Sequence, residues 1–174
     1  MIVCRTERLH LRELSADDAA FIMELVNEPA WLRFIGDRNV HSLDDARGYI
    51  EKGPIVSYGR NGFGLWAVEL SASGEPIGMC GLVRRQALEH VDLGFALLSR
   101  HGGHGYARES AAAAVERARD DFHLRKLVAI TDLDNVPSQK VLTSVGFRYD
   151  RLIHWTETGE DLALYEQDLA APAP

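Results

Sequence analysis

Seven stretches of the chain carry the hydrophobic patterns of β-strands. Most alternate between apolar and polar positions, whereas residues 127–131 form a short apolar run, as expected of a strand covered on both faces. Turn-forming residues at 71–75 and 157–160 join neighbouring stretches into hairpins. The predicted strands are residues 8–14, 63–70, 76–83, 91–98, 127–131, 147–156 and 162–169.

Helix signals mark four other stretches, residues 15–27, 42–52, 106–122 and 135–146. Ser15 and Ser42 precede acidic first turns and are expected to be N-caps. Pro29 and Pro54 are expected to stop the first two helices, which leaves residues 30–36 as a loop rich in large side chains. The third helix presents an alanine face that can lie close to a sheet.

The resulting order is strand, two helices, three strands, helix, strand, helix and two strands, which indicates an α+β fold. A chain of 174 residues suits one domain, expected over residues 1–169. Residues 170–174 are expected to be a flexible C-terminal tail.

Composition narrows the class of protein further. The chain is 46% hydrophobic and 26% charged, as in globular proteins, and its formal net charge of −7 argues against a nucleic-acid partner. Cys4 and Cys80 are far apart in sequence and are expected to be buried thiols. The sequence shows no signal-peptide core and no membrane span, so we expect a cytoplasmic protein without a membrane partner.

A glycine-rich loop stands between the predicted strand 91–98 and the alanine-faced helix. Glycines let the backbone approach a ligand closely, and a helix N-terminus offers free N–H groups, so an anion such as phosphate is expected here. An ordinary strand-to-helix turn explains the loop equally well when it is taken alone. The spacing fits neither a P-loop nor a dinucleotide-binding fingerprint.

The loop pattern Arg100-x-x-Gly103-x-Gly105 resembles the acyl-CoA pyrophosphate loop of the GNAT superfamily of N-acetyltransferases. The stretch from Asn135 to Phe147 resembles the second signature of that family, Asn-x-x-Ser followed by Gly-Phe. Residues 6–12 and 161–165 are similar to segments of its ribosomal-protein N-terminal acetyltransferases. With the matching order of elements, the chain is identified as a member of the superfamily.

This resemblance implies the GNAT fold, a mixed and mostly antiparallel sheet of about seven strands with about four helices. The fourth and fifth strands, 91–98 and 127–131, would splay apart and hold acetyl-CoA in the gap. The implied reaction transfers acetyl to a primary amine by direct attack in a ternary complex, without a metal. The amine could belong to a protein N-terminus or a small molecule, and a homodimer remains open.

The resemblance also implies which residues bind the cosubstrate. Backbone N–H groups from Gly103 to Tyr106 would hold the pyrophosphate, with Arg100 as a nearby cation. An N-cap role alone would also account for Asn135. The expected acetyl-CoA-binding set is Leu98, Arg100, Gly102, Gly103, His104, Gly105, Tyr106, Ala107, Asn135 and Ser138.

Three carboxylates are candidates for the base that deprotonates the amine. Asp92 comes first because it lies two residues before Gly94, where the resembling enzymes often carry Glu, although an outward-facing strand carboxylate is an equal alternative. Glu157 resembles an acidic catalytic residue of ribosomal-protein acetyltransferases, or is a plain turn residue. Glu89 is a weaker third candidate.

Four further side chains have both a functional and a purely structural interpretation. Ser138 would hydrogen-bond the leaving sulfur, as the family pattern favours, or is a solvated helix-start serine. Tyr165 would protonate the thiolate or belongs to the strand core. Trp31 and Phe34 would shape the acceptor pocket or anchor the core.

Two alternatives to an acetyltransferase stay open. A GNAT-fold module could bind acyl-CoA as a sensor without turnover, which the Asp at position 92 makes plausible. A general nucleotide-phosphate binder could use the same loop. The acceptor itself cannot be identified, although the lower pKa of an α-amine suits a weakly placed base.

Overall fold

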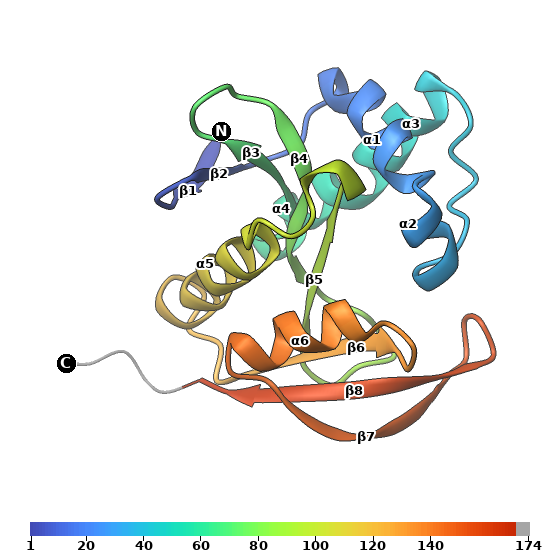
Figure 1. The fold of residues 1–174 in the computed structure, drawn as a ribbon, viewed down its shortest axis with the longest axis vertical. Coiled ribbons are helices and arrows are strands. Elements are labelled where there is room, and N and C mark those ends of the chain that lie inside the picture. Colours follow the sequence, from blue (N-terminus) through green and yellow to red (C-terminus); the bar gives the residue numbers. More distant parts are fainter. Residues whose placement is uncertain (170–174) are drawn as a thin grey trace.

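The computed structural model describes residues 1–169, which build one eight-stranded sheet with helices on both faces (Figure 1). The strand order is β1-β2-β3-β4-β5-β6-β8-β7. All neighbouring pairs are antiparallel except β5 and β6, which are parallel. The strands are β1 Ile2–Arg5, β2 Leu9–Arg12, β3 Leu65–Leu70, β4 Pro76–Val83, β5 Val91–Leu97, β6 Lys126–Asp132, β7 Arg148–Trp155 and β8 Glu160–Asp168.

This architecture confirms the predicted α+β class and the mixed, mostly antiparallel sheet. Seven of the strands lie within a few residues of the predicted stretches, and β1 is an addition. Strand β1 is an edge strand that pairs only with β2, and its short sequence gave no clear alternation. The predicted tail, residues 170–174, lies outside the described residues.

The helices are more numerous than expected. The first helix ends at Val26, before Pro29, as predicted, but a further helix begins at Pro29 and the second helix does not stop at Pro54. Pro29 begins α2, where its missing N–H group costs no hydrogen bond, so residues 30–36 are largely helical and the predicted loop was wrong. Pro54 lies inside a π-helical turn that connects α3 to α4, so the predicted stop there was also wrong. The helices are α1 Ala19–Val26, α2 Pro29–Phe34, α3 Leu43–Ile50, α4 Val56–Asn61, α5 Tyr106–Asp120 and α6 Val136–Ser144.

Each face of the sheet carries its own hydrophobic core. On one face, the alanine stripe of α5, including Ala114, packs against Val68 and Cys80 of the central strands. On the other face, α1 and α3 pack against Ala67 and Met79, the alternate residues of the same strands. This alternation is the reason that β3 and β4 are apolar on both sides. The two free cysteines form no disulfide.

The sheet opens between β5 and β6, as predicted for the fourth and fifth strands. These strands pair only at Val91 with Leu127 and at Asp92 with Val128. Beyond these pairs, β5 continues beside β4 and β6 continues beside β8, so the two strands diverge (Figure 1). Asp92 therefore lies at the apex of a V-shaped opening in the sheet.

Candidate active site

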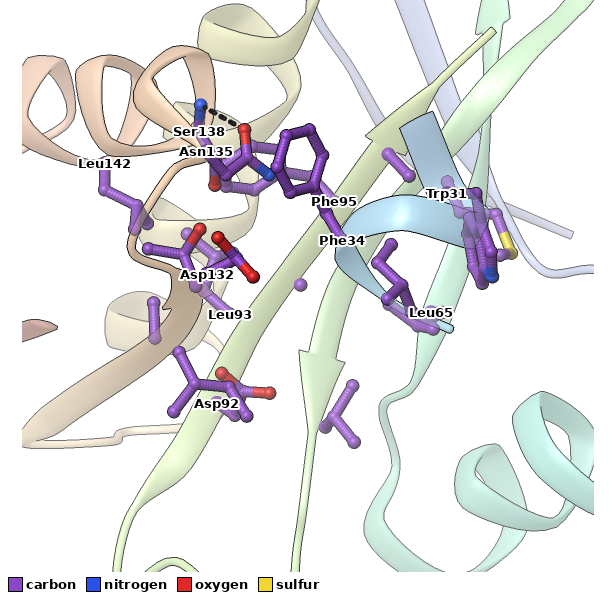
Figure 2. Close-up of a pocket in the computed structure, with 18 of the residues that line it drawn as sticks. Trp31, Phe34, Leu65, Asp92, Leu93, Phe95, Asp132, Asn135, Ser138 and Leu142 are labelled. Carbon is purple, nitrogen blue, oxygen red and sulfur yellow. Dashed lines mark hydrogen bonds between the residues drawn. The ribbon is translucent and has the colours of Figure 1, made fainter. Parts of the chain in front are cut away.

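A cavity of about 140 Å³ occupies the opening between β5 and β6. Figure 2 shows Asp92 toward one end of this cavity, with Asn135 and Ser138 of the α6 N-terminus toward the other. Trp31 and Phe34, both on α2, line it as well. The structure thus brings together α2, β5 and the N-terminus of α6, which are distant in sequence. We refer to this space as the catalytic cavity.

Asp92 is buried, with 2% of its surface exposed, and has one charged partner. The Nε of Arg85 donates a hydrogen bond of 2.7 Å to its Oδ2, whereas Oδ1 receives no well-formed hydrogen bond within residues 1–169. Burial raises the pKa of this carboxyl group to about 6, and the positive charge of Arg85 opposes part of that rise. The group therefore titrates close to neutral pH, which is the range that suits an acid–base catalyst.

Arg85 is a site residue that sequence analysis missed. It comes from the irregular segment between β4 and β5, lines the catalytic cavity and lies 5.8 Å from the centre of the Trp155 ring. A sequence signal for this pairing is weak, because a segment without periodicity does not reveal where its side chains point.

The first turn of α6 is organised by Asn135. Its Oδ1 accepts a hydrogen bond of 3.2 Å from the backbone N–H of Ser138, which confirms the predicted N-cap. The Ser138 hydroxyl makes no hydrogen bond within the part of the chain that the structure describes, so it is free to contact a ligand in the cavity.

Asp132 is a second carboxylate on the cavity wall that was not predicted. Its Oδ1 accepts a 2.7 Å hydrogen bond from the backbone N–H of Asp134, which fixes the turn between β6 and α6. In sequence it resembles a turn residue at the end of a strand, and its Oδ1 does stabilise that turn.

Trp31 and Phe34 form part of the wall of the catalytic cavity. Trp31 is 6% exposed, and its Nε1–H is buried without an acceptor among residues 1–169. A buried indole N–H normally finds a partner, so this donor is one of the few unsatisfied polar groups near the cavity. Phe34 is half-buried and lines the same wall.

A second cavity, of about 460 Å³, runs along the glycine loop to the N-terminus of α5. Trp31, Phe34, Asn135 and Ser138 line both this space and the catalytic cavity. The two spaces are therefore parts of one continuous site. The residues of the loop and of the first turn of α5 that line it are His101, Gly102, Gly103, Gly105, Tyr106, Ala107 and Arg108.

The glycine loop has the geometry of an anion cradle. Gly103 and Gly105 have φ angles of 78° and 81°, and a Cβ added to Gly103 would meet no atom within 4 Å. The N–H groups of Gly103, His104 and Gly105 donate no hydrogen bond within residues 1–169, and the first turn of α5 adds N–H groups that lack intrahelical acceptors. A phosphate fits this arrangement of free donors at the positive end of a helix.

The other expected cofactor residues are placed differently. Arg100 points to Glu24 and Glu75, with which it forms ion pairs, and it does not line the cavity. His104 is exposed and stacks on Tyr106 at 5.6 Å, outside the cavity lining. Leu98 is fully buried, so only its backbone is available.

Two cations that were not predicted lie beside the loop instead. Arg8 donates a 3.0 Å hydrogen bond to the carbonyl of His104, stacks 4.7 Å from the Tyr106 ring centre and pairs with Glu109. Arg108 lines the cavity itself. No sequence pattern indicated Arg8, because its contacts with His104 and Glu109 join residues that are about a hundred positions apart in the chain.

Three acidic or phenolic candidates lie away from the site. Glu157 is exposed in the β7–β8 turn, Glu89 is exposed before β5, and neither lines the cavities described here. The Tyr165 hydroxyl donates to Gln139 at 3.3 Å, on the other side of α6 from the catalytic cavity. Within residues 1–169, no cluster of three metal-ligating side chains is found and no helix is long and apolar enough to cross a bilayer.

Comparisons with known proteins agree with this geometry. The model of the acetyltransferase (GNAT) domain matches residues 8–148, so the chain belongs to this family of acyltransferases. It is 28% identical over 167 residues to the uncharacterized protein YkkB of Bacillus subtilis, which covers 93% of each chain.

Solved structures share the fold along almost the full length. An acetyltransferase from Agrobacterium tumefaciens superimposes with a TM-score of 0.80 at 26% identity, covering 94% of this chain and 92% of that one. A ribosomal-protein-S5-alanine acetyltransferase from Vibrio fischeri gives the same TM-score of 0.80 at 17% identity, covering 98% of each chain. The second likeness supports the fold alone.

Proposed function

We propose that the protein transfers an acetyl group from acetyl-CoA to a primary amine by direct attack in a ternary complex. The observation that carries this proposal is the continuity of the site. One space joins the free N–H groups of the glycine loop to the buried carboxylate of Asp92. A phosphate-bearing thioester and an amine can therefore meet inside one cavity.

The glycine loop would hold the pyrophosphate of acetyl-CoA. Free N–H groups from Gly103 onward stabilise negative charge at the α5 N-terminus, and Arg108 adds a permanent cation. The pantetheine arm would follow the unpaired edges of β5 and β6 toward the catalytic cavity. Asn135 and Ser138 stand on that path, where the Ser138 hydroxyl can donate to the departing sulfur.

Asp92 would act as the base, with proton transfer through a bridging water. At pH 7 a carboxyl group with a pKa of about 6 is mostly ionised and still basic enough to accept a proton. Supplying the neutral form costs roughly 1.1 kcal/mol for an α-amine and roughly 4.6 kcal/mol for a lysine amine. A base reached through water suits the easier α-amine.

The acceptor that this reasoning favours is therefore an α-amine, such as a protein N-terminus. The Vibrio fischeri structure of the same fold is named as an acetyltransferase of a ribosomal-protein alanine, which agrees with that class. Trp31 and Phe34 would form the acceptor wall.

A non-catalytic acyl-CoA sensor is the second candidate. It is favoured by one observation, the ion pair that Arg85 makes with Asp92 and that stabilises the carboxylate. A sensor would bind acetyl-CoA and release no thiol, and a nucleotide-phosphate binder would bind ATP as tightly as CoA.

The test is thiol release from acetyl-CoA in the presence of pooled peptides with free N-termini and of pooled small amines. Acceptor-dependent release from one pool supports the transferase, with N-acetylated peptides as the matched negative control. Tight acetyl-CoA binding without release from any pool supports the sensor.

A further inference from the structure

A third cavity, of about 690 Å³, opens on the far side of the catalytic cavity from the glycine loop. Its walls are α3, the π-helical turn that contains Pro54, α4 and the segment after β4. It adjoins the catalytic cavity, because five residues line both: Arg38, Tyr49, Leu65, Val83 and Arg85. We call this space the cationic cleft.

The lining of the cationic cleft has an excess of positive charge. Five basic residues line it, and among residues 1–169 the carboxylates that line it are Asp44 and Asp45 alone. Asp44 is paired with Arg47, and Asp45 accepts a hydrogen bond from the backbone N–H of His41. The basic residues are Arg38, Lys52, Arg60, Arg84 and Arg85.

Four of these cations have no charged partner. Arg38, Lys52, Arg60 and Arg84 form no ion pair within residues 1–169, whereas Arg85 is paired with Asp92. The chain as a whole has a formal charge of −7. A cluster of unpaired cations around one hollow of an acidic protein attracts anions and repels cations over several ångströms.

Two of the basic residues, Arg38 and Arg85, lie at the boundary between the cationic cleft and the catalytic cavity. Burial raises the pKa of Tyr49, while the positive charges of Arg38 and Arg85 lower it. Both guanidinium groups therefore lie close to the phenol that lines the two spaces. An acceptor whose amine approaches Asp92 from this side would extend its other end past Tyr49 into the cationic cleft.

We propose that the cationic cleft binds an anionic group of the acceptor, so that the substrate is an amine that also carries a carboxylate or a phosphate. This inference rests on the proposed acetyltransferase function and specifies its substrate class. An acidic peptide with a free N-terminus fits, because it combines an α-amine with carboxylates a few ångströms away. A polyamine does not fit, because it would bring further positive charge to the cleft.

The test is equilibrium binding of short peptide amides to the protein saturated with CoA, which allows no turnover. Three peptides differ only at positions two and three, which are Glu-Glu, Gln-Gln or Lys-Lys after an N-terminal Ala. We expect the Glu-Glu peptide to bind at least about tenfold more tightly than the Gln-Gln peptide, with the advantage shrinking as salt rises. A phosphoserine peptide in the same series distinguishes a phosphate preference from a carboxylate preference.

Variants inside and outside the cationic cleft test whether the anionic group binds there. Arg60→Ala with Arg84→Ala should remove most of the Glu-Glu advantage and leave Gln-Gln binding unchanged. The matched control is Arg125→Ala, an exposed cation that does not line the cleft. Equal affinity for Glu-Glu and Gln-Gln, tighter binding of Lys-Lys, or an equal loss in the control overturns the proposal.

These outcomes are separate from those of the proposed function. Selective anionic binding without thiol release contradicts turnover and retains the cleft. Thiol release with neutral or cationic acceptors, together with no anionic preference in binding, retains the transferase and contradicts the cleft.

Discussion

The guanidinium of Arg85 lies 2.7 Å from the carboxylate of Asp92 at the apex where β5 and β6 separate. The carboxylate is 2% exposed, and burial outweighs this pairing, so its pKa stays raised at about 6. Asp92 is thus an ionisable group whose protonation can change within the physiological range of pH. This property links the fold to the proposed chemistry.

Replacing Asp92 with Asn should remove the dependence of kcat on pH in the acidic range. For the wild type, kcat should fall as the pH drops through about 6, because the carboxylate becomes protonated. Asp92→Asn should lower kcat at pH 7.5 by about two orders of magnitude or more and remove that acid limb. The control is Glu157→Gln in the β7–β8 turn. An acid limb that persists in Asp92→Asn and disappears in Glu157→Gln would assign the base to Glu157.

The same substitution should not destabilise the protein at neutral pH. A folded-state pKa raised from 3.8 to about 6 means that the folded protein holds a proton that the unfolded chain has lost. The wild type should therefore lose about 3 kcal/mol of unfolding free energy as pH rises from about 4 to 6.

Urea unfolding of the two proteins at several pH values checks this expectation. Asp92→Asn should lack that loss and be at least as stable as the wild type at pH 7.5. An Asn variant that is less stable at neutral pH, with an unchanged slope between pH 4 and 6, contradicts the burial argument.

Arg85 should set the position of the acid limb. Removing its charge with Arg85→Gln leaves the Asp92 carboxylate buried without its cation, so the pKa should rise by about one to three units. The acid limb of kcat should move upward accordingly, and lower activity at pH 7 should recover at pH 9. A limb that stays near pH 6 would show that Arg85 does not tune Asp92.

The glycine loop should tolerate no side chain at Gly103 when CoA binds. Its φ of 78° and the empty space around its Cα suit a ligand, so Gly103→Val should weaken CoA binding by at least about a hundredfold. Titration calorimetry with CoA and ATP measures this loss.

The matched control is Gly159→Val, because Gly159 has a φ of 74°, is equally unobstructed and lies in the β7–β8 turn. This variant carries similar backbone strain and should keep its CoA affinity. Equal losses in both variants would indicate strain alone, and no loss in Gly103→Val would contradict the assignment of the loop.

Local sequence signals predicted the parts of the site that local geometry determines. The glycine loop, the Asn135 cap and the position of Asp92 on its strand all follow from neighbouring residues. Arg85 and Arg8 act through contacts between distant segments, which periodicity does not reveal.

Two further expectations, for Arg100 and for Pro54, differ from the structure. Arg100 was expected to face the ligand, but Glu24 and Glu75 provide nearer charges on its own side of the loop. Pro54 was expected to end a helix, but a π-helical turn accommodates its ring and the chain continues into α4. The cationic cleft depends on this continuation, because α4 forms one of its walls.

The most direct test of the account is mass spectrometry of the acceptor after incubation with acetyl-CoA, for the wild type and Asp92→Asn. We expect an acetyl group on the amine of at least one acceptor, formed by the wild type and nearly absent with the variant. Acetyl-CoA binding by both proteins without any acetylated acceptor would contradict a transferase and leave the sensor as the function of this fold.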